Sequence, residues 1–224
     1  MIKVKKERRL LPVLIGVMAA AMIVPGCRGA GAPEPRLLQT LETPAAKGTP
    51  GMTLEGYGWN IGDDGRATET DEPVKTISEV RVGRAGKTVQ VIRDSAWIET
   101  YDGKMCHGIE LRDVDFDGRP DLLFHAGCGA QNHCYHIWRF RPERNIFVYD
   151  PVFSEAIAGS IIDCDPSTKT IRCRWHVGGE SEDQFLETGK KPSEPTVFRV
   201  RDGQLTDRNG NVLPDHGIGR GKQE

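Results

Sequence analysis

Four aspartates within nine residues form the part of the sequence best suited to chemistry. The stretch reads Asp113-Val114-Asp115-Phe116-Asp117-Gly118-Arg119-Pro120-Asp121. Calcium takes about six to eight oxygen ligands, and carboxylates at alternate positions of a curled loop can converge on it where a glycine permits the sharp turn. We therefore predict a calcium loop whose ligands are Asp113, Asp115, Asp117, the Arg119 carbonyl and Asp121.

Electrostatic repulsion is the physical reason to expect a cation in this loop. Carboxylates so close together destabilise one another unless a positive charge neutralises them. The alternative is a solvated surface turn with its corner at Asp117-Gly118. Phe124 stands where a helix-loop-helix calcium motif has its glutamate, and the flanks at 108–112 and 122–125 have the length of strands. The arrangement resembles the strand-loop-strand calcium sites of integrin-type FG-GAP β-propeller repeats.

Short β-prone runs separated by turn signals are expected to position this loop. They are Val74–Val82, Lys87–Arg93, Trp97–Thr100, Gly108–Arg112, Asp121–His125, Tyr135–Phe140, Ile146–Tyr149, Lys169–Trp175 and Thr196–Arg201. We predict an all-β single domain, either propeller-like or a sandwich, over residues 53–205. Tryptophans about 40 residues apart match the spacing of propeller blades, although any β core buries large aromatics; they are Trp59, Trp97, Trp138 and Trp175.

The N-terminus predicts export and lipid anchoring. Five basic residues precede an apolar run from Leu10 to Val24, which is short for a membrane span and is typical of a signal peptide. The sequence that follows, Val24-Pro25-Gly26-Cys27, resembles the lipobox of bacterial lipoproteins. We expect cleavage after residue 26 and acylation of Cys27, then a flexible tether over 27–52, rich in Gly, Pro and Ala. By the same resemblance, Arg28 after the cysteine favours an outer-membrane lipoprotein facing the periplasm.

Net charge and cysteine content indicate which partners and which disulfides to expect. The net charge is −2, and it falls to −6 once the basic first 26 residues are removed, so no basic face for nucleic acid is expected. Disulfides are the usual state of cysteines in an oxidising compartment. We predict a Cys164–Cys173 disulfide across a hairpin and a Cys128–Cys134 disulfide closing a small loop, with Cys106 free. The alternative is that Cys106 pairs with Cys128 or Cys134. Residues 206–224 are expected to form a flexible tail.

A narrower family resemblance rests on three stretches. Residues 110–124 contain the aspartate loop, residues 127–132 read Gly-Cys-Gly-Ala-Gln-Asn, and residues 135–140 read Tyr-His-Ile-Trp-Arg-Phe. Together they resemble a family of secreted, calcium-binding, propeller-like bacterial lipoproteins. That family includes immunity proteins that inhibit peptidoglycan hydrolases delivered by antibacterial type IV secretion systems. The resemblance implies a non-enzymatic inhibitor of a peptidoglycan hydrolase or lysozyme-like enzyme.

Partner-binding residues are expected in the segment from Gly127 to Tyr135. Its glycines permit a protruding turn, and its polar side chains suit adaptable hydrogen bonding at low entropic cost. The candidates are Gln131, Asn132, His133 and Tyr135. The alternative for Tyr135 is a ring that packs in the core. The alternative function is a cell-envelope binding or scaffold lipoprotein without inhibitory activity.

The sequence also offers candidate residues for a zinc site and for a glycosidase active site. Zinc is commonly held by four nitrogen or sulfur ligands, and the candidate ligands are His125, Cys128, His133, Cys134 and His136, although their spacing matches no regular zinc motif. A glycosidase would need a carboxylate pair, for which the cluster is Glu180, Glu182, Asp183 and Glu187. A solvated acidic loop is the simpler interpretation of that cluster.

Overall fold

The computed structural model describes residues 33–44, 51–69, 74–99, 106–129, 132–159, 161–174 and 195–215. The N-terminal segment with Cys27, the acidic cluster at 180–187, Gln131 and Trp175 lie outside these ranges. The described chain is almost entirely antiparallel β-structure, which confirms the predicted all-β class. None of its helices has the length and hydropathy needed to span a bilayer.

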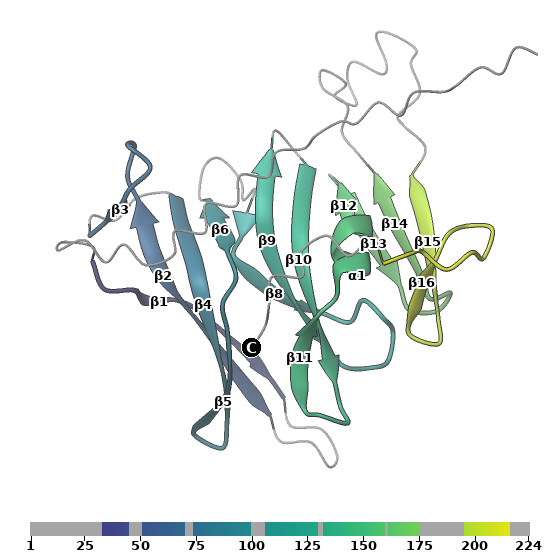
Figure 1. Ribbon diagram of the computed structural model, residues 1–224, viewed down its shortest axis with the longest axis horizontal. Helices are drawn as coiled ribbons and strands as arrows, with labels where there is room; N and C mark the ends of the chain where they lie inside the picture. The colour runs from purple at the N-terminus through teal and green to yellow at the C-terminus, as the bar shows by residue number, and fades with distance from the viewer. Residues whose placement is uncertain are drawn as a thin grey trace, which may run out of the picture. The chain divides into compact units, whose positions relative to one another are not determined.

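The first sheet is formed by the N-terminal third of the described chain (Figure 1). Its hydrogen-bonded order is β1-β2-β4-β6-β7, with β3 beside β2 and β5 beside β4. In β2, buried and half-buried residues alternate because one face covers the core and the other does not. The strands are β1 (Arg36–Thr43), β2 (Met52–Ile61), β3 (Ala67–Thr68), β4 (Val74–Arg84), β5 (Lys87–Ile92), β6 (Ala96–Glu99) and β7 (Cys106–His107).

The second sheet carries the aspartate loop, and the third follows it in the chain. The second has the order β11-β10-β9-β8 with β12 beside β10, and the third has the order β13-β14-β15-β16. The strands of the second sheet are β8 (Ile109–Arg112), β9 (Asp121–Gly129), β10 (Asn132–Arg141), β11 (Ile146–Tyr149) and β12 (Ala158–Gly159). Those of the third are β13 (Ile161–Asp165), β14 (Thr170–Arg174), β15 (Thr196–Arg201) and β16 (Gln204–Thr206).

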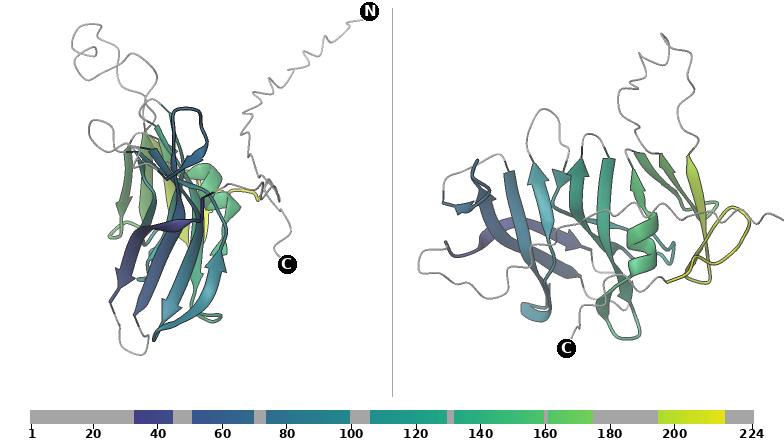
Figure 2. Two further views of the ribbon diagram at one scale, coloured as in Figure 1. Left: turned by 90° about the vertical axis from the view of Figure 1, so that its left-hand side faces the viewer. Right: turned by 45° about the horizontal axis from the view of Figure 1, so that its top comes forward.

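Both faces of the second sheet are buried, and this explains the uninterrupted apolar run Leu122-Leu123-Phe124 in β9. Leu122 and Phe124 of β9 pack into one core with the first sheet. Leu123, between them in the chain, points into a second core shared with the third sheet. A short helix, α1 (Pro151–Ala156), closes this second core through Phe153 (Figure 2, right).

The three sheets of the described chain do not close into the ring of a complete propeller (Figures 1 and 2). Trp59 lies on β2 and Trp97 on β6. These two strands belong to one sheet, so the tryptophans do not mark one blade each. Their spacing reflects the regular length of hairpins in an antiparallel protein and not a repeat.

Both predicted domain boundaries need correction. Part of the predicted tether over 27–52 is a strand, because β1 pairs along its length with β2. Leu38 and Leu41 of β1 pack against the first core, which gives this segment the apolar contacts that its composition had not suggested. The predicted tail over 206–224 is also ordered at its start. Leu213 packs on the second core, and its N–H donates to the carbonyl of Leu205.

Candidate functional site

The aspartate loop connects two neighbouring strands of the buried second sheet. β8 ends at Arg112 and β9 begins at Asp121, and these two residues pair across the hairpin. Within the loop, Phe116 and Gly118 have φ angles of 57° and 85°. A positive φ costs glycine little but is uncommon for a residue such as phenylalanine. The two left-handed residues curl the chain so that alternate side chains turn inward.

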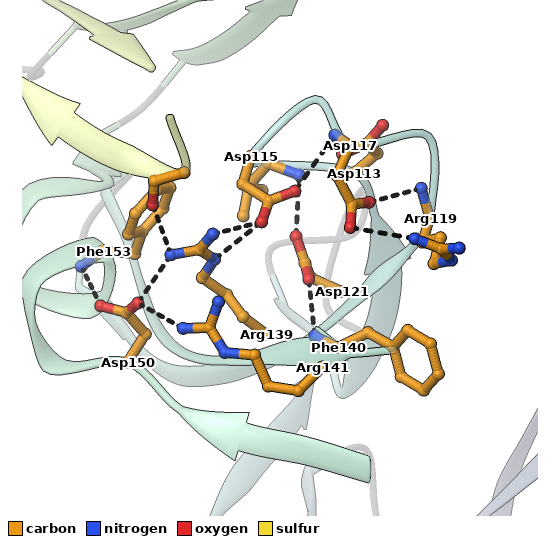
Figure 3. Close-up of polar contacts among 12 residues, drawn as sticks. Asp113, Asp115, Asp117, Arg119, Asp121, Arg139, Phe140, Arg141, Asp150 and Phe153 are labelled. Carbon is orange, nitrogen blue, oxygen red and sulfur yellow. Dashed lines mark hydrogen bonds and ion pairs between the residues drawn. The ribbon is translucent and has the colours of Figure 1, made fainter. Parts of the chain in front are cut away.

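Three of the predicted calcium ligands converge inside this curl. One oxygen from each of Asp113, Asp115 and Asp117 lies within 4.8 Å of the others (Figure 3). The Asp117 N–H donates to Asp113 and to Asp115 at 3.2 Å in each case, and the Gly118 N–H donates to Asp113 at 2.9 Å. Carboxylate oxygens held in this way are hard donors of the type that calcium prefers. These three residues therefore fit the predicted ion, and nothing in their geometry excludes it.

Asp121, the predicted fourth carboxylate ligand, is not among the three residues whose ligand atoms lie within 4.8 Å of one another. Its side chain is 1% exposed and accepts hydrogen bonds from the backbone N–H of Phe140 at 2.8 Å and of Val114 at 3.1 Å. Burial, and then the charge of Asp115, raise the pKa of Asp121 to about 7. Asp121 fastens the loop to β10. The Arg119 side chain approaches Asp117 at 3.6 Å, and its carbonyl remains a predicted ligand.

A buried arginine that the sequence analysis missed faces the loop from β10. The Arg139 side chain is 4% exposed and donates to Asp115 through Nε at 3.0 Å and through Nη2. It also donates to Asp150 at 3.0 Å and to the carbonyl of Gly203 at 2.8 Å (Figure 3). Burial alone would lower the pKa of Arg139, but its bonds to Asp115 and Asp150 outweigh burial and raise it.

Arg139 changes the electrostatic argument for the loop. The guanidinium already neutralises Asp115, so a divalent ion is not the only cation that can offset the clustered carboxylates. Asp113 and Asp117 have no such buried partner among the described residues; Asp117 has only the half-exposed Arg119. The sequence did hold a signal for this residue. Arg139 stands among the aromatic and aliphatic residues of Tyr135–Phe140, and an arginine buried there would need an acidic partner.

The predicted partner-binding residues differ in their access to solvent. Asn132 and His133 are half-buried at the start of β10, and Cys134 beside them is exposed. The Tyr135 side chain is 6% exposed and packs in the second core, which is the alternative that the sequence left open. Tyr135 is therefore not displayed on the surface. Of the other predicted contact residues, Asn132 and His133 are partly accessible to solvent and Gln131 lies outside the described residues.

The two predicted disulfides are wrong. Cys164, Cys173 and Cys134 are free thiols. Cys164 pairs with Ile171 and Cys173 with Ile162, so the two cysteines lie diagonally across the β13–β14 hairpin rather than opposite one another. Diagonal Cα atoms are about 7–8 Å apart, beyond the separation that a disulfide usually bridges. The free thiol of Cys134 likewise excludes its pairing with Cys128 or with Cys106. The expectation that Cys106 is free is also wrong, because Cys106 is disulfide-bonded.

The candidate zinc ligands do not form one group. His125, on β9, is buried on the same face of the sheet as its cross-strand partner Tyr135. His136 belongs to the opposite face, where its Nδ1 lies 2.7 Å from a carboxylate oxygen of Asp94. Cys134 is exposed, and the side chain of Cys128 is outside the described set. The set predicted from the sequence is therefore divided between two faces of the sheet.

Comparison with known proteins does not identify a family or a function for this site. No protein-family model and no curated protein matches the chain. A solved structure described as a Xanthomonas type IV secretion system related protein aligns with 82% of this chain and 98% of its own. The two share 12% sequence identity with a TM-score of 0.37, and this similarity is too low to support an inference about function.

Proposed function

We propose that the protein is a calcium-binding lipoprotein of the bacterial cell envelope that binds a peptidoglycan hydrolase and inhibits it. The observation that supports the metal is the convergence of three loop carboxylates within 4.8 Å of one another. A calcium ion there would be held by Asp113, Asp115 and Asp117 and would supply positive charge, not chemistry. Its role is structural, because the loop joins β8 and β9 of the second sheet, which lies between the two cores.

The inhibitory step is proposed to be steric. The first residues of β10, Asn132 and His133, lie partly accessible to solvent beside the exposed Cys134. Backbone pairing of Asn132 with Gly129 and of His133 with Cys128 holds the base of this connection in place. A pre-organised segment loses little conformational entropy on binding. Polar side chains at its end can occupy the positions of sugar hydroxyls in a glycan-binding cleft without themselves reacting.

The test is an inhibition assay with two enzymes, a muramidase and a peptidoglycan hydrolase encoded beside this protein. We expect one of them to be slowed by an equimolar amount of the protein. The variant Asn132→Ala should weaken the inhibition more than tenfold, whereas Asn211→Ala, in an exposed turn of the third sheet, should leave it unchanged. Absence of inhibition by stoichiometric protein would refute the proposal.

Two other outcomes identify different functions. Binding of the hydrolase without slower turnover supports the alternative, a non-inhibitory binding or scaffold lipoprotein. Release of soluble fragments from peptidoglycan by the purified protein alone would show that it is an enzyme, and would direct attention to Glu180, Glu182, Asp183 and Glu187.

A further inference from the structure

One buried histidine makes no hydrogen bond through its ring nitrogens to any described residue, and it lies among other side chains of the types that bind metals. His125, on β9, is 1% exposed, and neither Nδ1 nor Nε2 has a hydrogen-bond partner among the described residues. A buried imidazole carries one donor and one acceptor, and leaving both unsatisfied is costly. Buried polar groups are rarely left without partners in native proteins. The environment of His125 therefore points to a bound species.

The neighbours of His125 come from three other strands. The ring centre of His107, on β7, is 5.4 Å from that of His125, and the ring centre of His133, on β10, is 5.6 Å from it. Glu110, on β8, places a carboxylate oxygen 3.8 Å from Nε2 of His125. This separation is too long for a hydrogen bond and leaves room for an intervening atom.

We propose that His107, His125, His133 and Glu110 form a binding site for a divalent transition-metal ion of the zinc type. Imidazole nitrogens and a carboxylate are the ligands that zinc prefers after thiolates. Two imidazoles bound to one tetrahedral zinc have ring centres about 5 Å apart, since each Zn–N bond is about 2.0–2.1 Å. The two observed separations of 5.4 and 5.6 Å are close to that value.

The backbone around the site fixes the buried ligand and leaves the outer ones able to adjust. The N–H of His125 donates to the carbonyl of Gly108 at 2.9 Å, which holds the segment of His107 and Glu110 against β9. His107 is exposed and His133 is half-buried, so an ion can reach the site from solvent. Among the described residues, only the loop carboxylates form a group of three whose ligand atoms all lie within 4.8 Å of one another, so the ligand atoms of the histidine site are further apart as a set. The side chains of His107 and His133 must therefore rotate to bind a single ion.

This site is separate from the calcium loop, and it shares only His133 with the inhibitory proposal. Its ligands are nitrogen-rich, whereas Asp113, Asp115 and Asp117 provide only carboxylate oxygens, which suit calcium. It also differs from the zinc ligands suggested by sequence alone. His125 and His133 remain, His107 and Glu110 replace the two cysteines, and His136 is excluded by its position on the other face of the sheet.

The test is binding of zinc by the full chain, measured by equilibrium dialysis, with cobalt substitution to report geometry. We expect one zinc per chain and a visible cobalt spectrum typical of tetrahedral nitrogen and oxygen ligands. His107→Gln and His133→Gln should each weaken zinc binding more than tenfold. Both residues reach solvent, so these variants avoid the folding risk of replacing His125.

Matched controls distinguish this site from other zinc-binding groups. His136→Gln removes a histidine of the same strand, Cys134→Ser removes the exposed thiol, and Asp117→Asn weakens the calcium loop; all three should keep the affinity for zinc. Failure of the protein to bind zinc overturns the proposal. So does an affinity that survives both His107→Gln and His133→Gln, or one that is lost in any of the three controls.

Discussion

Arg139 is expected to contribute more to stability than any other charged side chain near the aspartate loop. It links three parts of the fold, since it bonds to Asp115 of the loop, Asp150 at the start of α1 and the carbonyl of Gly203. Its guanidinium also lies 4.4 Å from the ring centre of Phe153. Replacement by methionine keeps most of the apolar stem but leaves the Asp115 carboxylate buried, at 5% exposure, without its partner.

The expected loss follows from breaking a buried ion pair on one side. Such a change costs about 3–5 kcal/mol in free energy of unfolding. Arg141, on the same strand, gives the matched control, because its side chain is one-third exposed and lies 3.6 Å from Asp150. A surface pair of this kind contributes about 0–1 kcal/mol. Urea unfolding followed by tryptophan fluorescence in EDTA should therefore separate Arg139→Met clearly from Arg141→Met.

A double variant tests whether the pair with Asp115 is the cause. Removing both charges leaves no uncompensated ion, so Asp115→Asn combined with Arg139→Met should be more stable than the sum of the single losses predicts. Losses that simply add would show that the two side chains are not coupled. A loss in Arg139→Met no larger than that in Arg141→Met would refute the role assigned to the buried guanidinium.

Three other perturbations have outcomes set by single contacts. The bond to Asp94 raises the pKa of His136 above its ordinary 6.5. The stabilisation from this pair is therefore full below about pH 6.5 and is lost as pH rises through the raised pKa. In urea titrations, the stability of wild type relative to His136→Gln should fall between about pH 5.5 and 8.5. Gly58→Ala should prevent normal folding, judged by far-UV circular dichroism, because a Cβ there would overlap the backbone carbonyl of Thr76. The control Gly83→Ala, on the neighbouring strand β4, meets nothing closer than 3.5 Å and should fold. Phe124→Ala should cost about 3–5 kcal/mol in urea unfolding, since the ring is fully buried in the first core.

Local patterns in the sequence were sufficient to predict the β class and several strands. Ile146–Tyr149 and Thr196–Arg201 have the bounds expected from their alternating or branched residues and flanking turns. Arg36–Thr43 was missed because the Gly, Pro and Ala residues on both sides of it resemble a linker. Its strand conformation depends on pairing with β2, a tertiary contact that no local pattern contains.

The site shows the same division between local and long-range information. The spacing of Asp113, Asp115 and Asp117 predicts their convergence because a curled loop brings alternate residues together within one short segment. The separate position of Asp121 and the pairing of Asp115 with Arg139 depend on β10, which lies about 20 residues further along the chain. The register of the β13–β14 hairpin also determined whether the predicted disulfide could form. A shift of two residues places Cys164 and Cys173 out of reach of each other.

Calcium titration calorimetry of the metal-free protein and of Asp117→Asn tests the central claim most directly. Wild type should bind one calcium per chain, and calcium at about 100 times its Kd should add about 2.7 kcal/mol to the free energy of unfolding. Asp117→Asn should lose both effects, whereas Asp207→Asn, in an exposed turn elsewhere, should keep them. A protein that shows no heat of binding, and whose Tm is the same in EDTA and in calcium, would contradict the account.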